Sequence, residues 1–150
     1  MAKIVTSQLQ YKNYAVDKIS VESNPAFKQS PSNSIDNLDI DFNVLTKGKE
    51  QSFLIELILN INKSTKAFTN SRYRISLKLL SIFEFSANTP RSEIDKLLVP
   101  NGLAMSYSTS RGIIGELTGN SINGKYVLPT VNFIELIKNK SRKTTTKLRK

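Results

Sequence analysis

Apolar and polar residues alternate with a period of two through most of the first half of the chain. The clearest example is QSFLIELILNI at residues 51–61, where every second side chain is apolar, as in a strand with one face against a core. Residues 17–23, 37–45 and 71–86 alternate in the same way. Four successive strands without an intervening helical pattern predict an antiparallel sheet.

The connections between these strands differ in length and composition. Residues 46–50 (TKGKE) and 62–70 (NKSTKAFTN) suit hairpins, whereas residues 23–34 (SNPAFKQSPSNS) are long and contain two prolines, which argues against a tight turn. We therefore expect a long crossover loop between the first and second strands.

Beyond Ala87 the pattern becomes helical. Thr89, followed by Pro90, predicts the N-cap of a short helix. A stripe over residues 103–117 predicts a second helix, and Asn132 predicts the N-cap of a third, with Glu135 three residues later. The expected fold class is α+β, with a four-stranded antiparallel sheet followed by two main helices packed on it.

Composition removes most familiar catalytic chemistry. The 150 residues are 39% hydrophobic, enough for one domain with a core, and include neither Cys nor His. Thiolate metal sites, Cys nucleophiles and His bases are thereby excluded, and glycine-rich phosphate loops and an SxxK motif are absent. Asp36, Asp39 and Asp41 fit a solvated strand face better than a metal site. We expect no enzyme, metal or cofactor.

The net charge of +10 is concentrated at one end of the chain. Residues 138–150 hold seven of the 22 Lys and Arg and no acid, so the other residues carry 15 basic and 12 acidic groups, a net of +3. We expect a partly flexible arm at residues 1–13, one domain at 14–138 and a disordered basic tail at 139–150. The tail is either a solubilising extension or a contact for RNA, lipid or an acidic partner.

No apolar segment has signal-peptide or membrane-spanning length, which predicts a cytoplasmic protein without membrane insertion. Phe83 and Phe85 share a strand face, as on a base-stacking platform, but their neighbours are Glu84 and Ser86 rather than Lys or Arg. Apolar packing, in the core or in a groove, is the favoured interpretation, and nucleic-acid binding is not.

Five blocks resemble, in order, the SecB family of protein-export chaperones: DKISVESNPAF, LDIDFNVL, FLIELILNI, ISLKLLSIFEFS and LPTVNFIEL. They span about residues 14–137. The resemblance implies an α+β protomer, a homotetramer built as a dimer of dimers, and ATP-independent holding of unfolded polypeptides in apolar grooves for transfer to the translocation ATPase SecA.

The resemblance also implies site residues. By position, the client groove would be formed by Phe27, Phe83, Phe85, Tyr126, Val127 and Leu128. Four apolar residues on strand faces that a lone protomer would expose are candidates for the oligomer interface: Leu54, Ile58, Leu80 and Ile82. Alternatively, a helix or loop of the same chain covers them.

Three positions bear on partner choice. Glu22 occupies a position where the family docks SecA through acids, but Lys18 and Ser76 fall where further acids would be expected. This departure weakens the case for SecA. A related branch of SecB-like chaperones protects antitoxins of toxin–antitoxin systems, which is the first alternative. A nucleic-acid-binding module using the basic tail is the alternative of another class.

Overall fold

A computed structural model describes residues 1–29, 35–46, 48 and 51–148, and side chains as far as residue 143. Its elements are β1 (Leu9–Ser23), β2 (Leu38–Thr46), β3 (Ser52–Ile61), α1 (Thr65–Thr69), β4 (Tyr73–Phe85), α2 (Arg91–Gly119) and α3 (Phe133–Leu148). The predicted order of four strands followed by helices is confirmed, with the short α1 added between β3 and β4.

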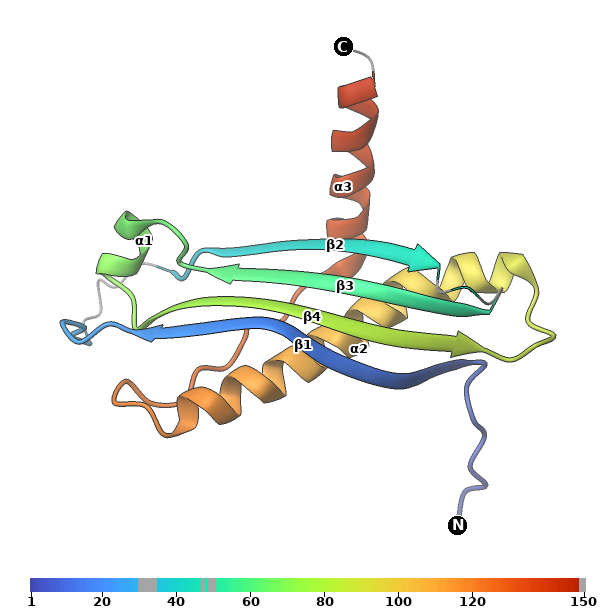
Figure 1. The fold of residues 1–150 in the computed structure, drawn as a ribbon, viewed down its shortest axis with the longest axis horizontal. Helices are drawn as coiled ribbons and strands as arrows, with labels where there is room; N and C mark the ends of the chain where they lie inside the picture. The colour runs from blue at the N-terminus through green and yellow to red at the C-terminus, as the bar shows by residue number, and fades with distance from the viewer. Residues whose placement is uncertain (30–34, 47, 49–50, 149–150) are drawn as a thin grey trace.

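The four strands form one antiparallel sheet in the order β1-β4-β3-β2 (Figure 1). Hairpins join β2 to β3 and β3 to β4, while the chain crosses from one edge of the sheet to the other between β1 and β2. The predicted α+β fold class and its crossover connection are therefore confirmed. In the β3–β4 connection, the Ser64 hydroxyl accepts a hydrogen bond from the Ala67 amide and caps α1.

Strand β1 begins at Leu9, so the N-terminal arm predicted at residues 1–13 includes strand. Leu9 is buried, and the Tyr11 ring stacks on Phe83 with 4.7 Å between ring centroids. The Tyr11 hydroxyl also lies within hydrogen-bond distance of Ser81 and Thr109. Contacts with residues remote in sequence thus order a segment in which local alternation is weak.

Strand β1 is an edge strand with an irregular register. Its pairing with β4 shifts between Tyr11 and Asn13 and again between Val16 and Lys18. Tyr14 and Val16 stay exposed although they are apolar. The shifts bend the strand locally, as bulges do.

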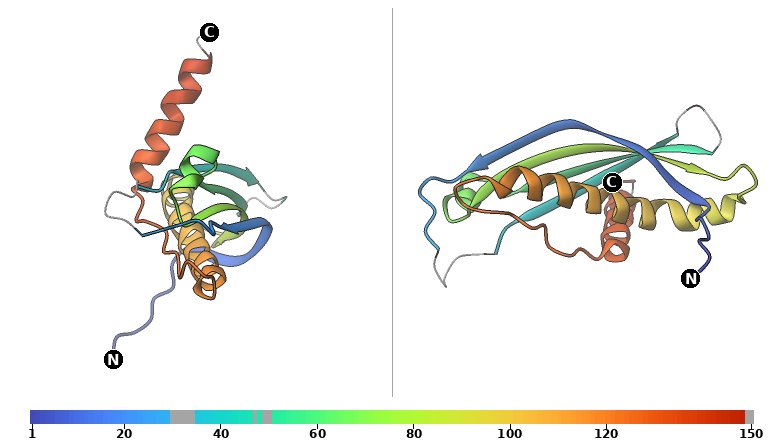
Figure 2. Two further views of the ribbon diagram at one scale, coloured as in Figure 1. Left: turned by 90° about the vertical axis from the view of Figure 1, so that its left-hand side faces the viewer. Right: turned by 90° about the horizontal axis from the view of Figure 1, so that it is seen from below.

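The core lies between one face of the sheet and α2 (Figure 2, right). Every second residue of β3 and β4 points to this face and is buried. Helix α2 contributes Ile94, Leu98, Leu103, Tyr107 and Ile114. The buried Ser106 hydroxyl donates to Ser81 Oγ at 2.9 Å, which satisfies both hydroxyls inside the core.

Helix α2 is one helix where the sequence predicts two. It continues through Pro100, and its N-cap is Pro90 rather than Thr89, whose side chain is buried without a cap bond. A proline inside a helix removes one backbone hydrogen bond. Burial of Leu98 and Leu103 on either side of it supplies the compensating packing.

Gly102 sets how closely α2 approaches the sheet. A Cβ at this position would lie 2.4 Å from Ile55 Cδ1 and 3.5 Å from Phe83 Cε2, whereas at Gly112 it would meet nothing within 4 Å. A Cβ at this position would therefore displace the side chain of the fully buried Ile55.

Gly102→Ala is expected to lower the free energy of unfolding by about 1 kcal/mol, because overpacking of about 2 kcal/mol exceeds the gain in helix propensity of about 1 kcal/mol. Gly112→Ala, the matched control in the same helix, is expected to raise it by up to about 1 kcal/mol. Chemical denaturation measures both. Equal stabilisation by the two substitutions would show that Gly102 does not set the distance between α2 and the sheet.

Helix α3 begins as predicted at the Asn132 cap, whose side-chain oxygen accepts from the Glu135 amide at 3.2 Å. The helix then extends to Leu148, so the segment predicted as a disordered tail is helical through that residue. It runs across the strand direction and projects beyond β2 (Figure 1). No helix in the described part of the chain combines the length and apolar character needed to cross a bilayer.

Candidate functional site

A pocket of about 570 Å³ lies where α2, α3 and β2 meet. Its walls are mainly apolar, with charged groups at the rim; the lining residues are Phe42, Asp95, Val99, Pro100, Ile137, Lys140 and Ser141. The volume is within the range of small-molecule pockets, and it suffices for one or two large apolar side chains.

Local sequence explains how each wall is supplied. Phe42 is one of the apolar residues in the alternation of β2 and turns toward the helices. Val99 and Pro100 come from α2, and Ile137 lies one helical turn after the beginning of α3. Val99 and Ile137 are only half-buried, so apolar surface stays accessible.

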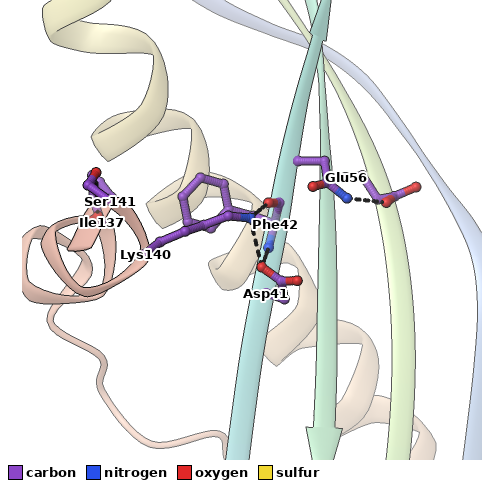
Figure 3. Close-up of polar contacts among 7 residues, drawn as sticks. Asp41, Phe42, Glu56, Ile137, Lys140 and Ser141 are labelled. Atoms are coloured by element: carbon purple, nitrogen blue, oxygen red, sulfur yellow. Dashed lines mark hydrogen bonds and ion pairs between the residues drawn. The ribbon is translucent and has the colours of Figure 1, made fainter. Parts of the chain in front are cut away.

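Lys140 holds α3 against β2 (Figure 3). Its ammonium donates to Asp41 Oδ1 at 2.7 Å and to the Phe42 carbonyl oxygen, and it lies 4.3 Å from the centroid of the Phe42 ring. One side chain thus makes an ion pair, a backbone hydrogen bond and a cation–π contact. It is the polar anchor at the pocket rim.

The environment of Asp41 is electropositive. The hydrogen bond from Lys140 lowers the pKa of the Asp41 carboxyl below its ordinary value, against the opposing effect of partial burial. The Phe42 amide and the charge of Lys143 lower this pKa further. A carboxylate is therefore stabilised where β2 meets α3.

The pocket offers mainly apolar area and few polar groups. Asp95 forms an ion pair with Arg91 at 3.0 Å one helical turn away, and within the described residues no group of three His, Cys, Asp or Glu could hold a metal. The walls supply apolar area that releases water when an apolar side chain enters. This interaction is non-directional and selects for apolarity rather than for one sequence.

The structure buries four of the six residues predicted to form a client groove: Phe83, Phe85, Tyr126 and Leu128 belong to the core. Tyr126 packs edge-on against Tyr73, and burial raises the pKa of its phenol. Phe27 is half-buried and Val127 is exposed. Only these last two are accessible to a partner in this chain alone.

The six residues also do not form one continuous surface. The crossover loop meets the loop before α3 at one end of the sheet, where the Asn123 amide donates to the Asn24 carbonyl at 2.9 Å. Phe83 lies ten residues farther along β4 than Tyr73, a separation of roughly 33 Å. Phe27 and Val127 therefore share one end of the sheet, and Phe83 and Phe85 lie at the other.

Leu128→Ser is expected to lower the free energy of unfolding by about 3 kcal/mol, because it leaves a cavity in the core and places a hydroxyl group there. Val127→Ser, at the neighbouring but exposed position, is expected to change it by less than about 0.5 kcal/mol. Urea denaturation measures both. A strong loss with Val127→Ser would mean that this loop is packed more tightly than its exposure indicates.

The four candidate interface residues lie on the sheet face opposite to α2. Leu54 pairs with Ile82 across β3 and β4, whereas Leu80 lies opposite Glu56 and Ile58 lies opposite Lys78 farther along the two strands. All four are half-buried. Leu45, which pairs with Leu54 from β2, is 53% exposed and extends the apolar stripe to the sheet edge.

Glu22, the candidate SecA-docking residue, lies on the same open face. Its carboxylate pairs with Arg74 at 3.4 Å. Nearby, Lys78 pairs with Glu56 at 2.9 Å and Asp17 at 3.4 Å. Glu22, Glu56 and Asp17 are thus each paired with a base.

The sequence places Phe42 in an alternating strand segment and Ile137 beyond the Asn132 cap, but it indicated neither as a member of a site. It also gave no indication of Val99, Pro100 or Lys140 as site residues. Pro100 was the available signal, since a proline within a helical segment marks a place where regular packing is interrupted. The pairing of Lys140 with Asp41 joins positions 99 residues apart and has no local signature.

The chain is thus an antiparallel α+β protein with one helix-covered sheet face and an apolar pocket at its edge. No family model and no curated protein matches it. Among solved structures, the fold is similar to that of the Mycobacterium tuberculosis SecB-like chaperone Rv1957 in complex with a ChAD peptide from the HigA1 antitoxin. The TM-score is 0.59 at 14% identity, and the match covers 83% of this chain and 91% of that one.

A Streptococcus agalactiae protein of unknown function is also similar, with a TM-score of 0.45 and 12% identity over 84% of this chain and all of that one. The first likeness shows that the chain has the SecB-like fold, as the sequence resemblance predicts.

Proposed function

We propose that this protein is an ATP-independent chaperone that holds an apolar segment of an incompletely folded polypeptide. The observation that carries the proposal is the apolar pocket between α2, α3 and β2 on a SecB-like fold. The proposed place of action is the cytoplasm, where newly made chains must be kept from aggregating. Because the pocket selects apolar groups without reading sequence, it suits clients that are recognised while unfolded.

A dedicated client is the second candidate, since the similar Mycobacterium tuberculosis chaperone is described with an antitoxin peptide. In that version the protein protects one antitoxin or a few, rather than many exported precursors. The balanced charge around Glu22 also favours it, because handover to SecA through carboxylates would find that residue already paired with Arg74. Identification of the polypeptides that copurify with the protein from cells separates the two versions.

Ile137→Asn is expected to weaken binding of a fluorescent apolar peptide about tenfold, because loss of the apolar side chain from the pocket wall removes about 1.5 kcal/mol. Fluorescence anisotropy measures this loss. Suppression of aggregation of a denatured client, without nucleotide, is expected to fall in parallel.

Ile134→Asn is the matched control, since Ile134 lies on the same helix and is 63% exposed outside the pocket lining. It is expected to leave peptide binding unchanged. Circular dichroism checks that both variants are folded. Equal binding by wild type and Ile137→Asn, or no peptide binding by wild type, would contradict the proposal.

We further infer that the chaperone works as a homotetramer, a dimer of dimers, with Leu54, Ile58, Leu80 and Ile82 at a contact between copies. Their apolar stripe on the open face supports this inference, as an accessible patch of this kind commonly marks an interface. Several linked pockets would also bind a long unfolded chain more tightly than one.

Light scattering is expected to give a mass near four times the 16.8 kDa of the chain. Leu80→Lys is expected to reduce it, because the substitution would bury an unpaired charge at the contact. Ile122→Lys, which adds the same charge at an exposed loop position, is expected to leave the mass unchanged. A wild-type mass equal to one chain would refute the assembly.

A further inference from the structure

Positive charge gathers on α3 beside the pocket. After Glu135 the sequence contains no acid, and residues 138–150 hold seven Lys and Arg. Within the described side chains, Lys138, Arg142 and Lys143 are exposed. Lys138 and Arg142 are one turn apart and share a helix face. The apolar pocket is therefore bordered by a cationic helix rather than by a neutral rim.

The environment of Asp41 shows that α3 stabilises a nearby carboxylate. Asp41 reaches the α3 side of β2 and accepts a hydrogen bond from Lys140 at 2.7 Å, with its side chain still 63% exposed. Lys143 also acts on it, lowering the pKa of its carboxyl. An acid contributed by the protein itself is stabilised here while open to solvent. An acid contributed by a bound polypeptide would meet the same field one turn farther along α3.

We propose that the site selects polypeptide segments in which apolar side chains are flanked by acidic ones, the apolar groups entering the pocket and the carboxylates lying along α3. This inference depends on the proposed chaperone function and adds a charge preference to it. It assigns a role to Lys138, Arg142 and Lys143, which the apolar pocket does not use. It also places the client's acids to one side of its apolar residues, because the charges lie to one side of the pocket.

A nucleic acid fits these observations less well. Phe42 is the aromatic residue of the pocket lining, and it is only 8% exposed beneath the Lys140 ammonium, so a base has no open ring there to stack on. The apolar walls would have no role. An acidic peptide uses both the walls and the cations.

The test compares two fluorescent peptides that share one apolar segment and differ in the residues on both sides of that segment, which are Asp in one peptide and Asn in the other. The full-length protein is expected to bind the Asp peptide about fivefold more tightly at low salt, as two exposed ion pairs would provide. The preference is expected to disappear at about 1 M salt, because the Debye length falls to about 3 Å and the exposed charges are screened from one another. Affinity for the Asn peptide is expected to persist.

The double variant Arg142→Gln/Lys143→Gln is expected to lose the preference for the Asp peptide while keeping its affinity for the Asn peptide. The matched control, Lys63→Gln/Lys66→Gln, removes two exposed lysines at the β3–β4 connection and is expected to keep the preference. Loss of the preference in both double variants would show a general charge effect and would overturn the assigned site.

The other outcomes separate the two proposals. If wild type binds the Asp and Asn peptides equally, the charge preference is wrong and the chaperone function stands. If it binds neither peptide, the proposed function is wrong and the inference falls with it. If a single-stranded RNA displaces the Asp peptide and binds more tightly through Arg142 and Lys143, the partner is a nucleic acid and the inference is overturned.

Discussion

The close packing of α2 on one face of the β3–β4 pair is the constraint on which the rest of the structure depends. Alternate residues of both strands turn to that face, and a helix must lie near enough to exclude water from them. Gly102 permits that approach over Ile55. Once α2 is fixed at this distance, Val99 and Pro100 face the edge of the sheet and β2 supplies Phe42 opposite to them. The pocket is thus a consequence of core packing, which places α2 beside Phe42 on the edge strand β2.

Helix α3 closes this edge without filling it. Its contact with β2 is polar, through Lys140 and Asp41, while its contribution to the pocket is apolar, through Ile137. A polar anchor defines where the helix lies, and the half-buried apolar surface beside it is left accessible. A binding surface needs a polar contact that is separate from its apolar wall, because apolar area that is already buried within the chain is not available to a ligand. The same helix carries its charge away from the core, where water solvates it.

The parts of the fold that were predictable from sequence are those specified by neighbours in the chain. Alternation predicted all four strands, and the Asn132 cap marked the beginning of α3. The features that were not predicted depend on contacts between residues far apart in the sequence. Leu9 and Tyr11 are ordered by pairing with β4. Pro100 is tolerated within α2 because Leu98 and Leu103 are buried. Of the predicted groove residues, Phe83 and Leu128 had the apolarity expected of a client surface, but apolarity alone does not distinguish a surface from a core. The pocket is lined by residues of β2, α2 and α3, and no local sequence pattern predicts that these three elements meet.

The irregular edge of β1 has a consequence for the protein's own solubility. A long, regular edge strand would offer its unpaired amides and carbonyls to any extended chain, and a chaperone surrounded by unfolded polypeptides would be especially exposed to such pairing. The two shifts in register, between Tyr11 and Asn13 and between Val16 and Lys18, interrupt the even spacing that a docking strand would have to match. Charged Asp17 and Lys18 lie at the second shift. In the proposed chaperone function, the irregular edge would keep bound polypeptides on side-chain contacts that can be released, and would avoid templating their aggregation.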